Sequence, residues 1–199
     1  MLTGIPDNYH FYLASRSPRR QQLLRDAGIN FEVIERDFEE TYPPALKGQE
    51  IAEYLAGAKA SCFPNNKMPD NQVIITADTI VWCDEQVLDK PRDEKEAFTI
   101  LSAVSGNSHD VITGICLLTS KGYHTFSETT RVTFCRLSEE EINHYIRHYR
   151  PYDKAGAYGI QEWIGIVGNS RIEGSYFNVM GLPVQRLISE LRMILGNKY

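Results

Sequence analysis

Apolar residues along this chain fall into short continuous runs and longer segments with helical spacing. The short runs are rich in β-branched or aromatic residues and bounded by polar or turn-forming ones, which predicts buried strands at 9–15, 31–34 and 73–77. Residues 80–83 either continue the third strand or begin a hairpin arm. Helical spacing followed by a stop signal predicts helices over 17–28, 49–63 and 93–105, with polar or proline-containing loops at 37–48 and 64–71.

The second half of the chain is expected to add a hairpin and two more helices. Strand-like segments at 109–119 and 125–137 flank Lys121-Gly122, a pair typical of a hairpin turn. Ser138 and Glu141 have capping-box spacing, so a helix should follow to about residue 149. The small-residue run at 153–161 matches no regular element, 164–167 and 171–173 have the pattern of short strands, and 183–195 is an amphipathic helix. The order of elements predicts a mixed α/β fold.

Composition narrows the class of protein. The 199 residues fit one large domain, or two lobes that share one core, and 42% hydrophobic with 24% charged residues is typical of globular proteins. No apolar run is long enough for a transmembrane helix, and residues 1–8 do not resemble a signal peptide. The four cysteines form no CxxC pair, which argues against a zinc site and favours a reduced, cytoplasmic protein.

The net charge limits the kinds of partner. With 21 Lys and Arg against 26 Asp and Glu, the formal charge is −5, so the chain lacks the positive field of a general nucleic-acid binder. Any anionic ligand must therefore be held by a local cluster of cations.

The first candidate cluster is Ser17-Pro18-Arg19-Arg20, where a strand leads into a helix. Arg19 and Arg20 fall at the second and third helical positions, where the helix dipole disfavours cations by about 0.3–1 kcal/mol each. A bound phosphate would reverse that effect, because free N–H groups, the Ser15 and Ser17 hydroxyls and two guanidiniums would converge on its oxygens. The alternative is two solvated arginines on a surface helix.

Asp78 is the second candidate, because it directly follows the apolar run VIITA. We expect it at the carboxyl end of a central strand, where open α/β sheets bind ligands. Together with Glu39 or Glu40, it could form an oxygen site for Mg²⁺ or Mn²⁺ bridged to phosphates. The alternatives are that Asp78 only caps a turn and that the glutamates are solvated charges.

Further candidates are two lysines and the small-residue run. Lys59 lies among Ala and Gly residues on a predicted helix, which leaves room for a ligand, and Lys90 precedes a proline after a short extended arm. Each could equally be a surface charge. The run at 153–161 would let the backbone approach a flat ligand closely, unless it is only a tight structural turn.

Five strings together resemble the Maf-type nucleotide pyrophosphatases. They occur in that family's order over about residues 12–187, nearly the whole chain: LASRSPRRQQLL, ADTIV followed by LDKP, SGNSHDVITG, DKAGAYGIQ and IEGSYFNVMGLP. Each string alone is weakly specific, but five in order make a chance match very unlikely. The chain resembles the dTTP/UTP pyrophosphatase branch, which carries Arg, Thr and Gln at the positions of Arg19, Thr79 and Gln161.

The resemblance implies a fold, a reaction and roles for single residues. It implies one Maf-like domain over 1–199, a two-lobed α/β structure with a long mixed sheet and a cleft, similar to inosine triphosphate pyrophosphatases. The expected reaction is metal-assisted hydrolysis of dTTP and UTP to monophosphate and pyrophosphate, with modified pyrimidine triphosphates as further substrates. By motif, Asp78 would be the proton acceptor and would bind the metal with Glu39. Glu39 aligns less securely than the other motif residues, and neighbouring Glu40 could take its role. The residues expected to bind substrate are Ser17, Arg19, Arg20, Lys59, Thr79, Lys90 and Gln161.

The chemistry of Gln161 agrees with the implied substrate. Its amide oxygen and amide NH₂ match the N3–H donor and O4 acceptor of uracil or thymine. Glu162-Trp163 departs from the family, which more often has small residues after YGIQ, and this affects the expected shape of the base pocket.

Two other functions compete with this one. The chain could be a nucleotide-binding regulator of cell division that needs no catalysis, since the family is associated with septum formation. It could also act on 7-methyl-GTP, like another branch of the family, although Arg19, Thr79 and Gln161 argue against that. Members of the family are often dimers, so a homodimer is an expectation too.

Overall fold

The computed structural model of the chain describes residues 4–64 and 68–196. The first residues of the chain and part of the predicted loop at 64–71 lie outside these ranges. Within them, no helix is both long and apolar enough to span a membrane. The strands are β1 His10–Leu13, β2 Phe31–Val33, β3 Gln72–Cys83, β4 Gln86–Val87, β5 Ser108–Thr119, β6 Gly122–Phe134 and β7 Asn169–Glu173. The helices are α1 Pro18–Asp26, α2 Gln49–Ser61, α3 Glu94–Val104, α4 Glu139–Tyr149, the 3-10 helix η1 Ala155–Ala157, α5 Trp163–Gly168, α6 Tyr176–Met180 and α7 Val184–Leu195.

The predicted mixed α/β fold is confirmed. The strands form one sheet in the order β2-β1-β3-β5-β6-β7, and β4 pairs with β3. β1 runs parallel to β2 and to β3, whereas β4 and β7 are antiparallel to their partners. Most of β3 is buried, as expected for the apolar run at 73–77.

The structure decides the question left open at 80–83, because β3 continues without interruption to Cys83. The expectation that Asp78 follows the end of this strand is therefore wrong. Its parallel neighbour β1 pairs only as far as Leu13 opposite Ile75, so β3 continues beyond the last residue that pairs with β1. Asp78 lies beyond the carboxyl end of β1, which is the edge where parallel strands leave room for a ligand.

Several predicted local elements are confirmed and one is wrong. The capping box at Ser138 and Glu141 is present, and the hairpin forms with its turn at residues 120–121. Residues 164–167 form helix α5 instead of a strand. The N–H groups of Gly165 and Ile166 both donate to the Glu162 carbonyl, and a Cβ at Gly165 would lie 1.9 Å from the Ile160 carbonyl oxygen. This close turn satisfies the backbone locally, which an apolar pattern alone does not reveal. Strand β4 lies in the short extended arm expected before Lys90. The 3-10 helix η1, within the run that matches no regular element in the sequence, and helix α6 were not predicted.

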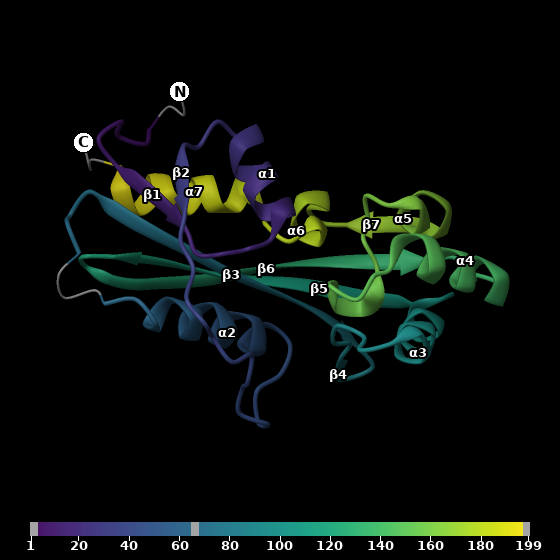
Figure 1. Cartoon of the computed structure of the whole chain (residues 1–199). Coiled ribbons are helices and arrows are strands. Elements are labelled where there is room, and N and C mark those ends of the chain that lie inside the picture. Colours follow the sequence, from purple (N-terminus) through teal and green to yellow (C-terminus); the bar gives the residue numbers. More distant parts are fainter. Residues whose placement is uncertain (1–3, 65–67, 197–199) are drawn as a thin grey trace. The chain divides into compact units, whose positions relative to one another are not determined.

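The chain divides into two compact units. Unit 1 comprises Met1–Asp78, Thr113–Glu128 and Gly181–Tyr199, and unit 2 comprises Thr79–Ile112 and Thr129–Met180. In unit 1, α2 covers one face of the strands and α7 the other (Figure 1). Ala56 and Ala60 of α2, with Phe63 just after the helix, pack against Ile74 of β3 and against Cys116 and Leu118 of β5.

Unit 2 has its own apolar core. Buried residues of α3 and α4 contribute to it together with Val81 of β3, Val132 and Phe134 of β6 and Ile164 of α5. The small-residue run also contributes, through Ala157, Tyr158 and Ile160. This run is therefore a packed structural element as well as a candidate binding segment.

Candidate functional site

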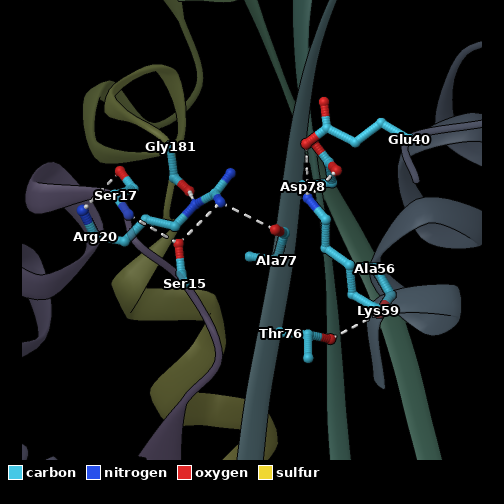
Figure 2. A network of polar contacts seen from close by, with 10 residues as sticks. All are labelled: Ser15, Ser17, Arg20, Glu40, Ala56, Lys59, Thr76, Ala77, Asp78 and Gly181. Atoms are coloured by element: carbon cyan, nitrogen blue, oxygen red, sulfur yellow. Dashed lines mark hydrogen bonds and ion pairs between the residues drawn. The ribbon is translucent and has the colours of Figure 1, made fainter. Parts of the chain in front are cut away.

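Asp78 is a buried carboxylate held by a lysine in unit 1. Its residue is 7% exposed, and its Oδ2 lies 2.5 Å from Nζ of Lys59, which comes from α2. The same ammonium lies 3.2 Å from Oε1 of Glu40, a residue of the loop between β2 and α2. Figure 2 shows Lys59 reaching from the helix to both carboxylates. Lys59 thus compensates two negative charges, one of them largely removed from water.

The position of Lys59 follows from how α2 packs on the sheet. Thr76 of β3 is fully buried, and its hydroxyl donates to the Ala56 carbonyl of α2 at 2.7 Å (Figure 2). On β5, Gly114 allows the α2 backbone to come close, because a Cβ there would lie 2.1 Å from the Ala52 carbonyl oxygen. Lys59 follows Ala56 by three residues and so lies on the same side of the helix. The packing of α2 on the sheet therefore directs Lys59 towards Asp78, which follows Thr76 by two residues on β3.

The Ser17-Pro18-Arg19-Arg20 junction forms the predicted helix start. Ser17 is the N-cap of α1 and accepts a hydrogen bond from the Arg20 N–H at 3.4 Å, Pro18 occupies the first turn, and no acidic residue lies there. The Ser17 N–H donates to the Ser15 hydroxyl at 3.2 Å. The helix begins with two arginines in its first turn, as the sequence indicates, and its dipole supplies no favourable interaction for them.

Arg20 is anchored by backbone carbonyls. Its Nε donates to Gly181 O at 2.8 Å, and its Nη1 donates to Ala77 O at 2.9 Å and contacts the Ser15 hydroxyl at 3.4 Å (Figure 2). The Ala77 carbonyl points towards the side of β3 that β1 has already left, so the guanidinium takes the place of a strand neighbour. Burial lowers the pKa of Arg20 and the nearby Asp78 carboxylate opposes this shift, but a guanidinium remains charged in proteins.

Some of the same residues have the oxygen atoms that a divalent metal ion requires. Among the described residues, no group of three or more Asp, Glu, His or Cys side chains is arranged to hold an ion. Mg²⁺, however, is usually bound by one or two carboxylates together with substrate phosphates and water. Asp78 and Glu40 share one cation, Lys59, so both carboxylates reach a common point and fit that requirement. Glu39 is exposed, and the contact with Lys59 belongs to Glu40.

Three predicted residues lie in unit 2. Thr79 directly follows Asp78 on β3, Lys90 lies exposed after β4, and Gln161 ends the small-residue run. The Gly156 N–H donates to the Leu88 carbonyl at 2.9 Å, which joins the run to the arm that carries Lys90. The side-chain oxygen of Gln161 is buried and has no hydrogen-bond partner within the described part of the chain.

The structure thus brings one set of predicted residues together and adds two features. Unit 1 gathers Ser17, Arg20, Lys59 and Asp78 in one network. Sequence reasoning did not predict the Lys59–Glu40 contact or a polar cluster around Glu162 in unit 2, where Lys154 Nζ lies 3.2 Å from the Glu162 carboxylate. In the sequence, the only signal for Glu162 was that the family more often has a small residue at this position. A groove of about 390 Å³ in unit 2 contains none of the predicted residues and is lined by Phe98, Ser102, Ser105, Gly106, Arg136, Leu137, Glu139 and Ile142.

Comparison with known protein families shows to which family the chain belongs. The family model described as Maf-like protein matches residues 10–194. The chain belongs to the Maf-like protein family. The resemblance inferred from the five sequence strings is therefore confirmed.

Two named relatives match nearly the whole chain. The chain of this Maf-like protein is 54% identical over 189 residues to a dTTP/UTP pyrophosphatase of Phocaeicola vulgatus, covering 94% of this chain and 97% of the relative. It is 44% identical over 187 residues to a dTTP/UTP pyrophosphatase of Flavobacterium johnsoniae, covering 94% and 96%. Among solved structures, a HAM1 protein from Coxiella burnetii is similar at 18% identity and a TM-score of 0.41, over 65% of this chain and 74% of that one.

Proposed function

We propose that this Maf-like protein hydrolyses UTP and dTTP to the monophosphate and pyrophosphate. Relatives at 54% and 44% identity bear the name dTTP/UTP pyrophosphatase. The observation that carries the proposal is the buried Asp78 carboxylate held by Lys59, in the same network as the Ser17 and Arg20 helix start. Such a group can receive a proton while the cations around it attract a polyanion.

The reaction requires that phosphate charge be neutralised and a water molecule be aligned. Phosphoryl chemistry rests mainly on positioning and electrostatic stabilisation. In this proposal Arg19, Arg20, Lys59 and Lys90 neutralise the triphosphate, and Ser17 and the N–H groups that open α1 add hydrogen-bond donors. Asp78 accepts the proton of the water that attacks the α-phosphorus, and the Asp78 side chain is fixed by Lys59.

The chain also has residues that would hold a divalent metal. We propose that Asp78 and Glu40 bind Mg²⁺ or Mn²⁺, with Glu39, the residue that the motif resemblance implies, as the neighbouring alternative. A bound ion would supply Lewis-acid stabilisation of the charge on the phosphates. Lys59 would then exchange one carboxylate contact for a contact with a phosphate oxygen.

The base is proposed to be read by Gln161. Its buried side-chain oxygen has no partner in the described structure, and a buried acceptor of this kind is unfavourable until a donor reaches it. The N3–H of uracil or thymine is such a donor, and the amide NH₂ can donate to O4 of the same ring. Adenine presents the reverse pattern, an N1 acceptor beside an N6 donor, whereas guanine carries a similar N1–H and O6 pair on a larger, two-ring base that only the size of the pocket would exclude. Thr79 is expected to contribute to the same preference.

The test is a panel of nucleoside triphosphates incubated with Mg²⁺ or Mn²⁺, with the products separated by chromatography. UTP and dTTP should yield monophosphate and pyrophosphate faster than the purine nucleotides do. Release of single phosphates would contradict the proposed bond cleavage, and binding without turnover would favour the regulator. Gln161→Ala should reduce the preference for UTP over ATP, and the exposed Gln185→Ala is the matched control.

A further inference from the structure

Gln161 lies in a tight four-residue turn, Gly159 to Glu162. The Glu162 N–H donates to the Gly159 carbonyl at 2.9 Å, so Gln161 occupies the third position of the turn. Immediately afterwards α5 begins, with Glu162 as its N-cap residue. The orientation of the Gln161 amide therefore depends on how firmly the two ends of this turn are held.

A single oxygen atom, the hydroxyl of Tyr145, holds both ends. Tyr145 comes from α4 and is fully buried. Its hydroxyl accepts a hydrogen bond from the Gly159 N–H at 3.0 Å and donates one to the Glu162 carboxylate. Burial raises the pKa of Tyr145, and the hydrogen bond to Glu162 raises it further, so the hydroxyl keeps the proton that it donates.

The Glu162 carboxylate is held in place by its neighbours in unit 2. It does not cap its own helix, although Glu162 holds the N-cap position. Instead it lies against Gly159, where a Cβ would be 2.8 Å from its Cδ. Its charge is compensated by the ammonium of Lys154, a residue that is 8% exposed and also lies 2.7 Å from Oδ1 of Asp153.

We infer that Tyr145 and Glu162 are positioning residues that set base specificity by clamping the turn that carries Gln161. This inference rests on the proposed function, in which Gln161 reads the base. The clamp replaces the small residue expected after Gln161 with a carboxylate anchored in the core of unit 2. A hydrogen-bonding reader discriminates well only when its donors and acceptors are held in the geometry of the correct ring.

Tyr145→Phe removes the one oxygen and keeps the buried ring. We expect the UTP-over-ATP ratio of kcat/KM to fall by about 10-fold to about 100-fold, towards the value of Gln161→Ala, because small misplacements of a binding group cost this much. ATP turnover should stay unchanged. In the double variant Tyr145→Phe/Gln161→Ala, the ratio should equal that of Gln161→Ala alone, since a clamp without its reader has nothing to position.

Tyr149→Phe is the matched control. Tyr149 lies one turn later on α4, its ring stacks on Tyr145 at 5.0 Å, and its side chain is partly exposed. Removing its hydroxyl should leave the ratio unchanged. A purely structural role of Tyr145 would instead lower turnover of UTP and ATP equally, and that result would overturn the clamp.

A second variant covers the case in which Tyr145→Phe does not fold. Glu162→Ala removes the other half of the clamp and should lower the ratio in the same way, while Glu162→Gln, which still accepts from Tyr145, should restore most of it. An unchanged ratio in Glu162→Ala overturns the inference.

The variants also separate this inference from the proposed function on which it rests. If Gln161→Ala leaves the ratio unchanged, Gln161 does not read the base, and both proposals are wrong. If Gln161→Ala changes the ratio but the Tyr145 and Glu162 variants do not, only the inferred role of Tyr145 and Glu162 is wrong.

Discussion

Lys59 Nζ lies 2.5 Å from Oδ2 of Asp78, and the two residues come from different elements, α2 and β3. Both side chains are mostly shielded from water, with 18% and 11% exposed. Removing one partner of such a pair leaves a poorly solvated charge, whereas the pair itself contributes little net stability. Substitution of Asp78 and substitution of Lys59 should therefore have different effects on turnover and on the free energy of unfolding.

Asp78→Asn should abolish most turnover while the protein remains folded. Loss of a general base lowers kcat by about 100-fold or more. The free energy of unfolding should fall only slightly, because Lys59 keeps its contact with Glu40. Lys59→Met should lower it more, by about 2–3 kcal/mol, because the buried Asp78 carboxylate loses the ammonium at 2.5 Å.

Urea denaturation and steady-state kinetics on both variants check this prediction. The exposed Asp37→Asn serves as the control for removal of a carboxylate in unit 1. Full turnover in Asp78→Asn would exclude Asp78 as the proton acceptor. Equal stability losses in the two variants would contradict the asymmetry.

Arg20→Lys should destabilise the protein although it keeps the charge. The planar guanidinium donates through Nε to Gly181 O and through Nη1 to Ala77 O, and a single ammonium cannot reproduce both directions. With hydrogen bonds from charged donors contributing about 1.5–3 kcal/mol each, we expect a loss of about 2 kcal/mol in the free energy of unfolding. Thermal unfolding should show it, and Arg36→Lys, in the exposed loop after β2, should show no change.

The sequence predicts the parts of this molecule that depend on local pattern. The apolar run VIITA predicts a buried strand, the Ser17-Pro18 pair predicts a helix start, and Ser138 with Glu141 predicts a capping box, all of which form. The family is likewise recognisable from the order of its motifs.

Features that depend on neighbours distant in the sequence could not be predicted. Where β3 stands free of β1 is set by the short register of β1, and the Asp78 position follows from that register. The choice of Glu40 over Glu39 at Lys59 depends on the path of an irregular loop. The role of Glu162 depends on Tyr145, 17 residues earlier, and no spacing rule connects them.

Gly114→Ala should be strongly destabilising, whereas Gly57→Ala should be tolerated or stabilising. A Cβ at Gly114 would lie 2.1 Å from the Ala52 carbonyl oxygen, so α2 would have to move away from the sheet. Overpacking of this kind costs about 1–3 kcal/mol or more. At Gly57, within α2 itself, the nearest neighbour of a Cβ is 4.0 Å away, and Ala should add about 0.5–1 kcal/mol through helix propensity.

Chemical denaturation of the two alanine variants measures both effects with the same added methyl group. Because α2 carries Lys59, Gly114→Ala should also lower turnover. A Gly114→Ala variant as stable as the unchanged protein would show that the contact between α2 and β5 is not tight.

His109 should make the protein less stable in acid. It is 2% exposed, its Nε2 lies 2.7 Å from the Tyr158 hydroxyl, and its ring stacks against Phe134. Burial lowers the pKa of His109 from 6.5 to about 4, against a small opposing effect of Asp110. Between these values the unfolded chain binds a proton that folded His109 does not, so the free energy of unfolding falls as pH falls. From pH 7.5 to pH 5 this residue alone should remove about 2 kcal/mol.

His109→Gln isolates this effect from the titration of carboxylates, which both proteins share. The variant should lose less stability than the unchanged protein between pH 7.5 and pH 5, by about 2 kcal/mol in urea denaturation. The exposed His10→Gln should keep the original pH dependence. If His109→Gln retains the full loss in acid, then His109 is not the group that takes up the proton on unfolding.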